Sequence, residues 1–249
     1  MPSFTDSAIC IRKLDWSETS QIVVLMTEGH GKVSATAKGA KRQSPSTLAK
    51  FSGGIELLTA GEAVLITKPT ADLANLIEWD LREGHWHLRR DLAGFHRAMY
   101  AADLVHHLVQ DRDPHPETYR LLKRFLEELA DSSRGAGALL RFQWGLIEDL
   151  GFQPILDRDA GTGRRLEKSA VTVAFSPAAG GVVADTGEGD RWRVRRETVD
   201  VLQQLAGGMD DPADPVTVVR ANRLLCAYLR SVLDRELPTM ARILADDGA

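Results

Sequence analysis

The sequence contains few cysteines, few aromatic residues and no long hydrophobic run. Its 249 residues include two cysteines, Cys10 and Cys226. No cationic segment followed by an apolar core begins the chain, so we expect no secretory signal. Two distant thiols then predict small buried side chains rather than a disulfide. No apolar run approaches the roughly 18–20 residues that cross a bilayer, and we therefore expect a cytoplasmic protein with no membrane partner.

Motifs of covalent catalysis are also missing. The sequence has no GxSxG, GxxxxGK[ST] or HExxH pattern and no carboxylate cluster like that of a nuclease. We therefore predict that the protein is not an enzyme and uses no cofactor. Asp103 and His107, spaced i and i+4 on a predicted helix, could share a metal ion. Surface histidines are the commoner case, so we predict no metal site.

Charge is distributed unevenly along the chain. The net charge of −4 argues against a protein that coats nucleic acid over its whole surface. Residues 1–70 nevertheless carry +2 and residues 71–249 carry −6. Between Gly29 and Lys50 there are five Lys or Arg residues and no Asp or Glu. This segregation predicts a phosphate-binding region near the N-terminus and a protein-binding region in the remainder.

The basic region coincides with a predicted β-hairpin. Ile22–Met26 is β-branched and aliphatic, and a Glu-Gly-His-Gly turn follows it. From Lys32 to Lys38 apolar and polar residues alternate, which places the polar ones on an outer face. Cations and hydroxyls in a row can follow a phosphate backbone without reading its bases. The predicted nucleic-acid contacts are Lys32, Ser34, Thr36, Lys38, Lys41 and Arg42.

Aromatic platforms for base stacking are scarce. Proteins that bind single strands usually offer them, yet residues 1–69 contain only Phe4, Trp16 and Phe51. Trp16 precedes a polar Ser-Glu pair in a predicted loop and could either stack on a base or pack against the protein. The sequence favours packing. We therefore expect binding that is electrostatic and indifferent to base sequence.

The hydrophobic period predicts an α+β fold. Short alternating runs at 8–13, 22–26, 32–38, 55–58 and 63–67 suit a small closed barrel, of which the OB-fold is the commonest nucleic-acid-binding type. The period then changes to about 3.6 residues, which predicts helices at 70–81, 88–105, 116–129, 137–150, 197–205 and 215–237. We thus expect an OB domain over 1–70 and an α-helical domain over 71–245. A loop and β-hairpin excursion interrupts the helices at 152–193.

An ordered set of motifs resembles the RecO family of bacterial recombination and repair proteins. The set comprises ETSQIV followed by GHGKVSATAKGAKR within residues 18–42, GFQPILD at 151–157 and FSPAAGGVV at 175–183. The resemblance implies binding of single- and double-stranded DNA, annealing of complementary strands, and loading of recombinase onto DNA coated by single-stranded DNA-binding protein. It implies RecR and the C-terminal tail of that coating protein as partners. It also implies a nucleoid-associated protein of the RecF pathway.

The chain departs from the family at its zinc site. Many members of the family that this sequence resembles hold a structural zinc ion between two CxxC pairs. Alignment of the flanking motifs places those four cysteines at Asp159, Thr162, Ala184 and Gly187. Since none of the four is cysteine or histidine, we predict a zinc-less excursion.

A partner-tail site is expected on the helical part. An acidic, hydrophobic tail needs an apolar pocket with a cationic rim. Residues of two neighbouring predicted helices could form it: Tyr119, Arg120, Lys123, Arg124, Arg141 and Phe142. Equally, these cations could balance Glu127 and Glu128 on an ordinary surface.

Two other functions remain alternatives. One is an OB-type module that binds RNA or the ribosome and docks proteins through its helices, which a preference for structured RNA over single-stranded DNA would indicate. The other is a metal-dependent nuclease using Asp103 and His107, which metal-dependent cleavage would reveal.

Overall fold

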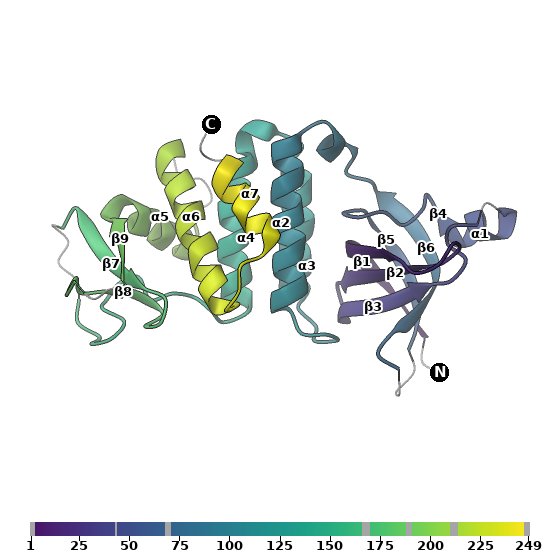
Figure 1. Cartoon of the computed structure of the whole chain (residues 1–249), viewed down its shortest axis with the longest axis horizontal. Helices are drawn as coiled ribbons and strands as arrows, with labels where there is room; N and C mark the ends of the chain where they lie inside the picture. The colour runs from purple at the N-terminus through teal and green to yellow at the C-terminus, as the bar shows by residue number, and fades with distance from the viewer. Residues whose placement is uncertain are drawn as a thin grey trace. The chain divides into compact units, whose positions relative to one another are not determined.

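The chain divides into two compact units, Met1–Ser132 and Ser133–Ala249, which we call unit 1 and unit 2 (Figure 1). The computed structural model describes residues 3–42, 44–67, 71–165, 170–187, 191–209 and 214–246, with side chains up to residue 243. Within those residues, no helix has the length and apolar character needed to span a bilayer.

Unit 1 is built on a sheet that closes on itself. Its strands are β1 (Ser3–Asp15), β2 (Gln21–Thr27), β3 (Gly31–Ala37), β4 (Phe51–Ser52), β5 (Ala60–Ile66) and β6 (Ala74–Glu83). The sheet order is β3-β2-β1-β5-β6-β4, and β3 also pairs with β6 in parallel. The sheet therefore closes on itself in the order β1-β2-β3-β6-β5-β1. This is the pairing of an OB-fold, so the predicted fold class is confirmed, with helix α1 (Pro45–Lys50) following β3.

The core of the sheet follows the alternation seen in the sequence. Val33, Ala35 and Ala37 of β3 point into the closed sheet and are at most 2% exposed. They pack with inward residues of the other strands, such as Leu25 and Trp79. Because successive side chains of a strand alternate between faces, the polar residues of β3 point outward.

Residues 74–83 form strand β6, so the predicted helix at 70–81 is wrong. The pairing register between β5 and β6 shifts by one residue, since Val64 is opposite Glu78 while Leu65 is opposite Leu76. Ile77 is the extra residue of this bulge. The bulge turns both Leu76 and Trp79 inward. The predicted helix rests on the spacing of Leu73, Leu76, Ile77 and Leu81. The sheet therefore runs past the predicted domain boundary at residue 70.

The predicted strand at 55–58 is also wrong. Leu58 lies in a turn with φ 64°, and the backbone around it bonds to Cys10 of β1 instead of entering the sheet ladder. Ile55 is still buried, at 3% exposure. The apolar run was thus a signal of burial rather than of strand structure.

Two helices of unit 1 cover part of the outer face of the sheet. The 3-10 helix η1 (Trp86–Arg89) leads to α2 (Leu92–Leu108) and α3 (Pro116–Glu128), close to the predicted ranges. The helices lie against β1 and β2 (Figure 1). Ile9, Val24 and Met26, which point outward, are consequently at most 6% exposed. One end of the outer face is buried, and the other end is open.

Unit 2 combines helices with a three-stranded sheet. Its elements are η2 (Ser132–Arg134), α4 (Gly135–Asp149), β7 (Thr172–Ser176), β8 (Gly181–Val183), β9 (Trp192–Arg195), α5 (Arg196–Ala206), α6 (Pro215–Val232) and α7 (Pro238–Asp246). The sheet order is β8-β7-β9. The β7–β8 hairpin matches the prediction, whereas β9 and α7 were not predicted. Residues 166–169 and 188–190 of the predicted excursion lie outside the described residues.

A carboxylate joins the two loops where the family's zinc cysteines align. Asp159 Oδ1 accepts the N–H of Gly161 at 2.9 Å, and it accepts the N–H and hydroxyl of Thr162 at 2.6 and 2.9 Å. Oδ2 accepts the N–H of Ala184 at 2.5 Å. These bonds, the Ala184 bond first, lower the pKa of Asp159. Three of the four aligned positions are thus linked by hydrogen bonds. In the residues described, no three His, Cys, Asp or Glu side chains are grouped to hold a metal ion.

We predict that Asp159→Ala lowers the stability of unit 2 by about 2 kcal/mol or more, because several charge-assisted hydrogen bonds are lost. Thermal unfolding measures this loss, and a chelator should leave the wild-type transition unchanged. The folded-state pKa is depressed, so the contribution of Asp159 is complete above the unfolded value of ~3.9 and fades as pH falls through the folded value.

Asp157→Ala is the matched control, because that carboxylate is two residues away and its side chain is 70% exposed. Its stability should change by no more than about 0.5 kcal/mol. Equal stability of Asp159→Ala and the wild type, or a transition lowered by the chelator, would show that Asp159 does not join these loops.

Candidate nucleic-acid interface

The hairpin turn that begins β3 is covered by the segment between α2 and α3. Gly31 has φ 69°, and a Cβ there would lie 2.1 Å from the carbonyl oxygen of Asp113. Only glycine allows both this backbone conformation and this close approach. The N–H of Arg112 donates to the carbonyl of Lys32 at 2.9 Å, which ties the same segment to the strand.

Lys32 lies under this cover, which corrects its expected place on an open face. The residue is 7% exposed. Its Nζ donates to the carbonyl oxygen of His106 at 2.5 Å and pairs with Asp111 Oδ1 at 3.1 Å. Lys32 therefore caps the C-terminal end of α2, where carbonyls lack helical partners and a cation is favourable. Its ammonium group holds the helix on the sheet.

A neutral histidine completes the covered end. Arg12 Nη1 lies 2.9 Å from His106 Nε2, and since arginine can only donate, Nε2 accepts and the ring proton is on Nδ1. Burial, followed by the charge of Lys32, lowers the pKa of His106 to about 4. The imidazole is thus uncharged at neutral pH. This agrees with the hydrogen bond from Arg12, because only a neutral imidazole has a nitrogen that can accept it.

The opposite end of the outer face is open. Along β3 the polar side chains change from buried Lys32 through half-buried Ser34 and Thr36 to exposed Lys38. A groove of about 370 Å³ lies there, lined by Trp16, Ser17, Thr19, Ser20, Thr36, Lys38, Gly39 and Arg42. It joins the β1–β2 loop to the turn after β3. Ser34 belongs to neither the groove nor the buried cluster.

The cations of this turn differ in what they contact. Lys41 Nζ pairs with Asp15 Oδ1 at 2.7 Å, and this bond lowers the pKa of the Asp15 carboxyl. The N–H of Lys41 also donates to the carbonyl of Thr19 at 3.2 Å. Lys38 and Arg42 are exposed and, across the described part of the chain, form no ion pair. Lys41 holds two loops together, while Lys38 and Arg42 are available to a ligand.

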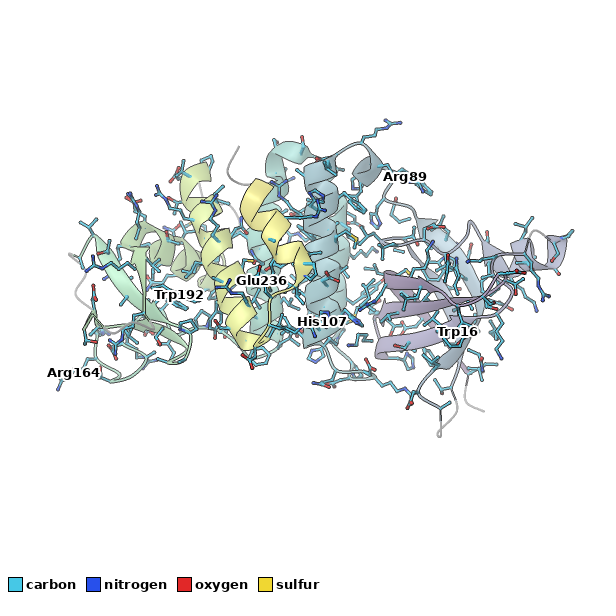
Figure 2. The ribbon with its side chains drawn as sticks, viewed as in Figure 1. Trp16, Arg89, His107, Arg164, Trp192 and Glu236 are labelled. Carbon is cyan, nitrogen blue, oxygen red and sulfur yellow. The ribbon has the colours of Figure 1, made fainter. Side chains whose placement is uncertain are left out.

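Trp16 is exposed, so the packing role favoured by its sequence is wrong. The side chain is 70% exposed on the β1–β2 loop, where Figure 2 labels it. Its position between Asp15 and Ser17, without apolar neighbours, was the sequence signal for exposure. Base stacking was disfavoured because residues 1–69 contain only three aromatic residues.

The residues expected to form a partner-tail pocket divide between the units. Tyr119 of α3 and Phe142 of α4 are 5% and 2% exposed, so neither ring offers an open apolar surface. Arg120 pairs with Glu117 and Glu28, and Arg124 pairs with Glu128. Lys123 is exposed and Arg141 is half-buried. The tail site at these residues stays a prediction that the structure does not strengthen.

Unit 2 contains a larger cavity that the sequence did not indicate. Its volume is about 850 Å³, within the range of about 300–1,000 Å³ typical of ligand sites. Its lining combines apolar and charged side chains, including Trp144, Ile155, Arg165, Arg196, Asp200 and Gln203. Trp144 is 5% exposed, and its indole N–H has no hydrogen-bond partner within the described residues. The lining thus combines apolar side chains and two arginines with the carboxylates of Asp157 and Asp200.

Comparisons with known proteins agree with this architecture, which defines a protein of the OB-fold class with a helical C-terminal unit. The family models of the N-terminal and C-terminal parts of recombination protein O match residues 1–85 and 89–241. The chain therefore belongs to the RecO family. Membership makes it a DNA repair protein and confirms the resemblance stated from the motifs.

Relatives named DNA repair protein RecO cover most of the chain. The one from Rhodopirellula baltica is 32% identical over 215 residues, which are 86% of this chain and 78% of the relative. That from Myxococcus xanthus is 29% identical and covers 96% of both chains. That from Symbiobacterium thermophilum is 30% identical and covers 95% of both.

We predict that Lys32→Met lowers stability by about 2 kcal/mol while DNA affinity of the folded protein stays within twofold of the wild type. The substitution keeps the aliphatic stem but removes a charged donor from the carbonyl of His106 and from the exposed carboxylate of Asp111. Thermal unfolding and fluorescence anisotropy with a labelled oligonucleotide measure the two effects.

Lys38→Met is the comparison variant, since Lys38 is exposed and lies at the opposite end of β3 from Lys32. It should leave stability within about 0.5 kcal/mol and weaken DNA binding. If the Lys32→Met protein is stable and loses as much DNA affinity as Lys38→Met, Lys32 contacts DNA and the structural role assigned to it is wrong.

Proposed function

We propose that the protein binds single- and double-stranded DNA through the groove at the open end of β3, anneals complementary strands, and acts with RecR to help a recombinase displace single-stranded DNA-binding protein. Family membership supports the DNA repair context. The observation that carries the proposal is the pair Lys38 and Arg42, exposed beside hydroxyl groups and not engaged by carboxylates in the described residues.

The groove has the chemistry of a backbone reader. Lys38 and Arg42 can each neutralise a phosphate, and the hydroxyls of Ser17 and Thr36 can donate to phosphate oxygens. None of these contacts depends on base identity. With two phosphate contacts and a slope of about −0.7 per contact, single-strand affinity should fall by roughly sevenfold between about 50 and 200 mM salt. If all five Lys or Arg residues between Gly29 and Lys50 met phosphates, the loss would be roughly a hundredfold.

Annealing requires nothing beyond these contacts. Two complementary strands repel each other through their phosphates, and a protein that places cations near both lowers this repulsion. Base pairing then supplies the driving force. The proposed step therefore uses neither nucleotide hydrolysis nor a bound metal ion.

We predict that Lys38→Ala/Arg42→Ala anneals complementary oligonucleotides, precoated with single-stranded DNA-binding protein, at least tenfold more slowly than the wild type. The variant loses the two cations that the groove offers to phosphate. Annealing is followed by fluorescence energy transfer between labelled strands. Circular dichroism should show an unchanged fold because both side chains are exposed.

Arg82→Ala/Arg90→Ala is the charge-matched control, since it removes two exposed cations of unit 1 outside the groove. It should anneal at the wild-type rate. Equal loss in both variants would reduce the effect to net charge and contradict the groove. Wild-type binding to structured RNA in preference to single-stranded DNA would instead support an RNA-binding module.

We further propose that the cavity of unit 2 receives the acidic, hydrophobic tail of single-stranded DNA-binding protein. Arg165 and Arg196 supply positive charge for carboxylates, while Ile155, which is 39% exposed, supplies apolar surface. Together they match the requirement for an apolar pocket with a cationic rim. Asp157 and Asp200 in the same lining balance the two arginines and restrict where carboxylates can lie.

We predict that Arg196→Glu weakens binding of a fluorescent tail peptide at least tenfold, because like charge replaces opposite charge beside the peptide carboxylates. Fluorescence anisotropy gives the dissociation constant. Arg193→Glu, an exposed change on strand β9 outside the cavity, should bind normally. If Arg120→Glu/Arg124→Glu loses binding and Arg196→Glu does not, the site lies on α3, as the sequence suggested.

A further inference from the structure

Trp16 presents an unused aromatic face. Its side chain is 70% exposed, whereas Trp79 and Trp144 are 1% and 5% exposed. Large aromatic side chains usually bury most of their surface, because they contribute more by burial than other residues do. Across the described residues, no other ring stacks on Trp16 and no cation lies over it. Its exposure therefore has no explanation within the fold.

The loop that carries Trp16 is held in one conformation. The N–H groups of Trp16 and Ser17 both donate to the carbonyl of Ser20 at 3.2 Å. Ser17 Oγ accepts the N–H of Ser20 at 3.1 Å, and the N–H of Gly39 donates to Ser20 Oγ at 3.4 Å. The Lys41–Asp15 ion pair adds a further tie. A preformed platform loses little conformational entropy when a ligand binds.

Trp16 also lies in the same groove as the exposed cations Lys38 and Arg42. Serine and threonine hydroxyls line the groove with them. Glu18, the acidic residue of the loop, is not part of the lining. A planar apolar face next to two cations complements a nucleotide, which has a planar base and a negatively charged phosphate on either side.

We propose that this groove is a subsite for one unpaired nucleotide, whose base stacks on Trp16 while its flanking phosphates bind Lys38 and Arg42. The inference rests on the proposed function and adds to it a preference for single strands. In a duplex both faces of each base are already stacked, so a duplex uses only the phosphate contacts. Any base can occupy the site, because every base has a π-face.

The test is binding of the full chain to a thymidine oligonucleotide, to the same oligonucleotide with abasic sites, and to a duplex. We expect Trp16→Ala to bind the thymidine oligonucleotide about tenfold more weakly than the wild type. Its duplex affinity and the salt dependence of its binding should be unchanged. The wild type should lose about tenfold on abasic DNA, whereas Trp16→Ala should no longer distinguish abasic from intact DNA.

Two further variants separate stacking from exposure. Trp16→Phe keeps a ring and should retain most of the affinity while losing most of the quenching of tryptophan fluorescence by the oligonucleotide. Trp86→Ala is the matched control. That indole is 50% exposed, but Arg89 already lies over its ring at 4.3 Å. Its removal should change neither single-strand affinity nor quenching.

The outcomes distinguish this inference from the function on which it rests. If Lys38→Ala/Arg42→Ala loses DNA affinity but Trp16→Ala binds every probe like the wild type, stacking is refuted and the proposed function stands. If the wild type binds no DNA, both are refuted. An equal loss of duplex and single-strand affinity in Trp16→Ala would also refute the subsite, since it would point to a general disturbance of the groove.

Discussion

The structure of unit 1 depends on one contact, in which the hairpin turn before β3 meets the segment between α2 and α3. Gly31 lets the backbone of Asp113 approach, and the ammonium of Lys32 joins the end of α2 to the strand. A buried charge is tolerated there because it has both a carbonyl and a carboxylate as partners. The contact covers one end of the outer face and leaves the other end open. It thereby decides where a ligand can reach the sheet.

Local pattern predicted the faces of the strands well, but it could not predict their neighbours. The alternation in β3 identified Val33, Ala35 and Ala37 as the core. Nothing near Lys32 reveals that it will be buried or that it will pair with Asp111, far along the chain. Likewise, the apolar spacing of β6 does not reveal the bulge at Ile77. The OB-fold was predictable because most strand signals agreed, whereas the burial of Lys32 was missed because its cover is a tertiary contact.

The same limit applies in unit 2. The resemblance of the flanking motifs implied that the family's four zinc-binding positions lack cysteine here, but it could not show what joins these loops. A single carboxylate can accept several hydrogen bonds, and Asp159 uses both oxygens to bind the two loops. Unlike a zinc ion, this link needs no metal supply, although it depends on ionisation of the carboxyl group. The loops are thus joined by a different chemistry at the same place in the sequence.

Both units place some charged groups in structural roles and leave others available. Lys32 and Lys41 each have carboxylate partners, so they orient the helix cover and the loop pair. Lys38 and Arg42, on the turn that Lys41 helps to hold, are exposed to solvent. Since a cation already paired with a carboxylate gains less from a phosphate, counting the basic residues of this segment overstates its affinity for DNA. Under the proposed function, binding by two cations alone would be weak, so a contact with the bases would add to it, and Trp16 is the exposed aromatic side chain that lines the described groove.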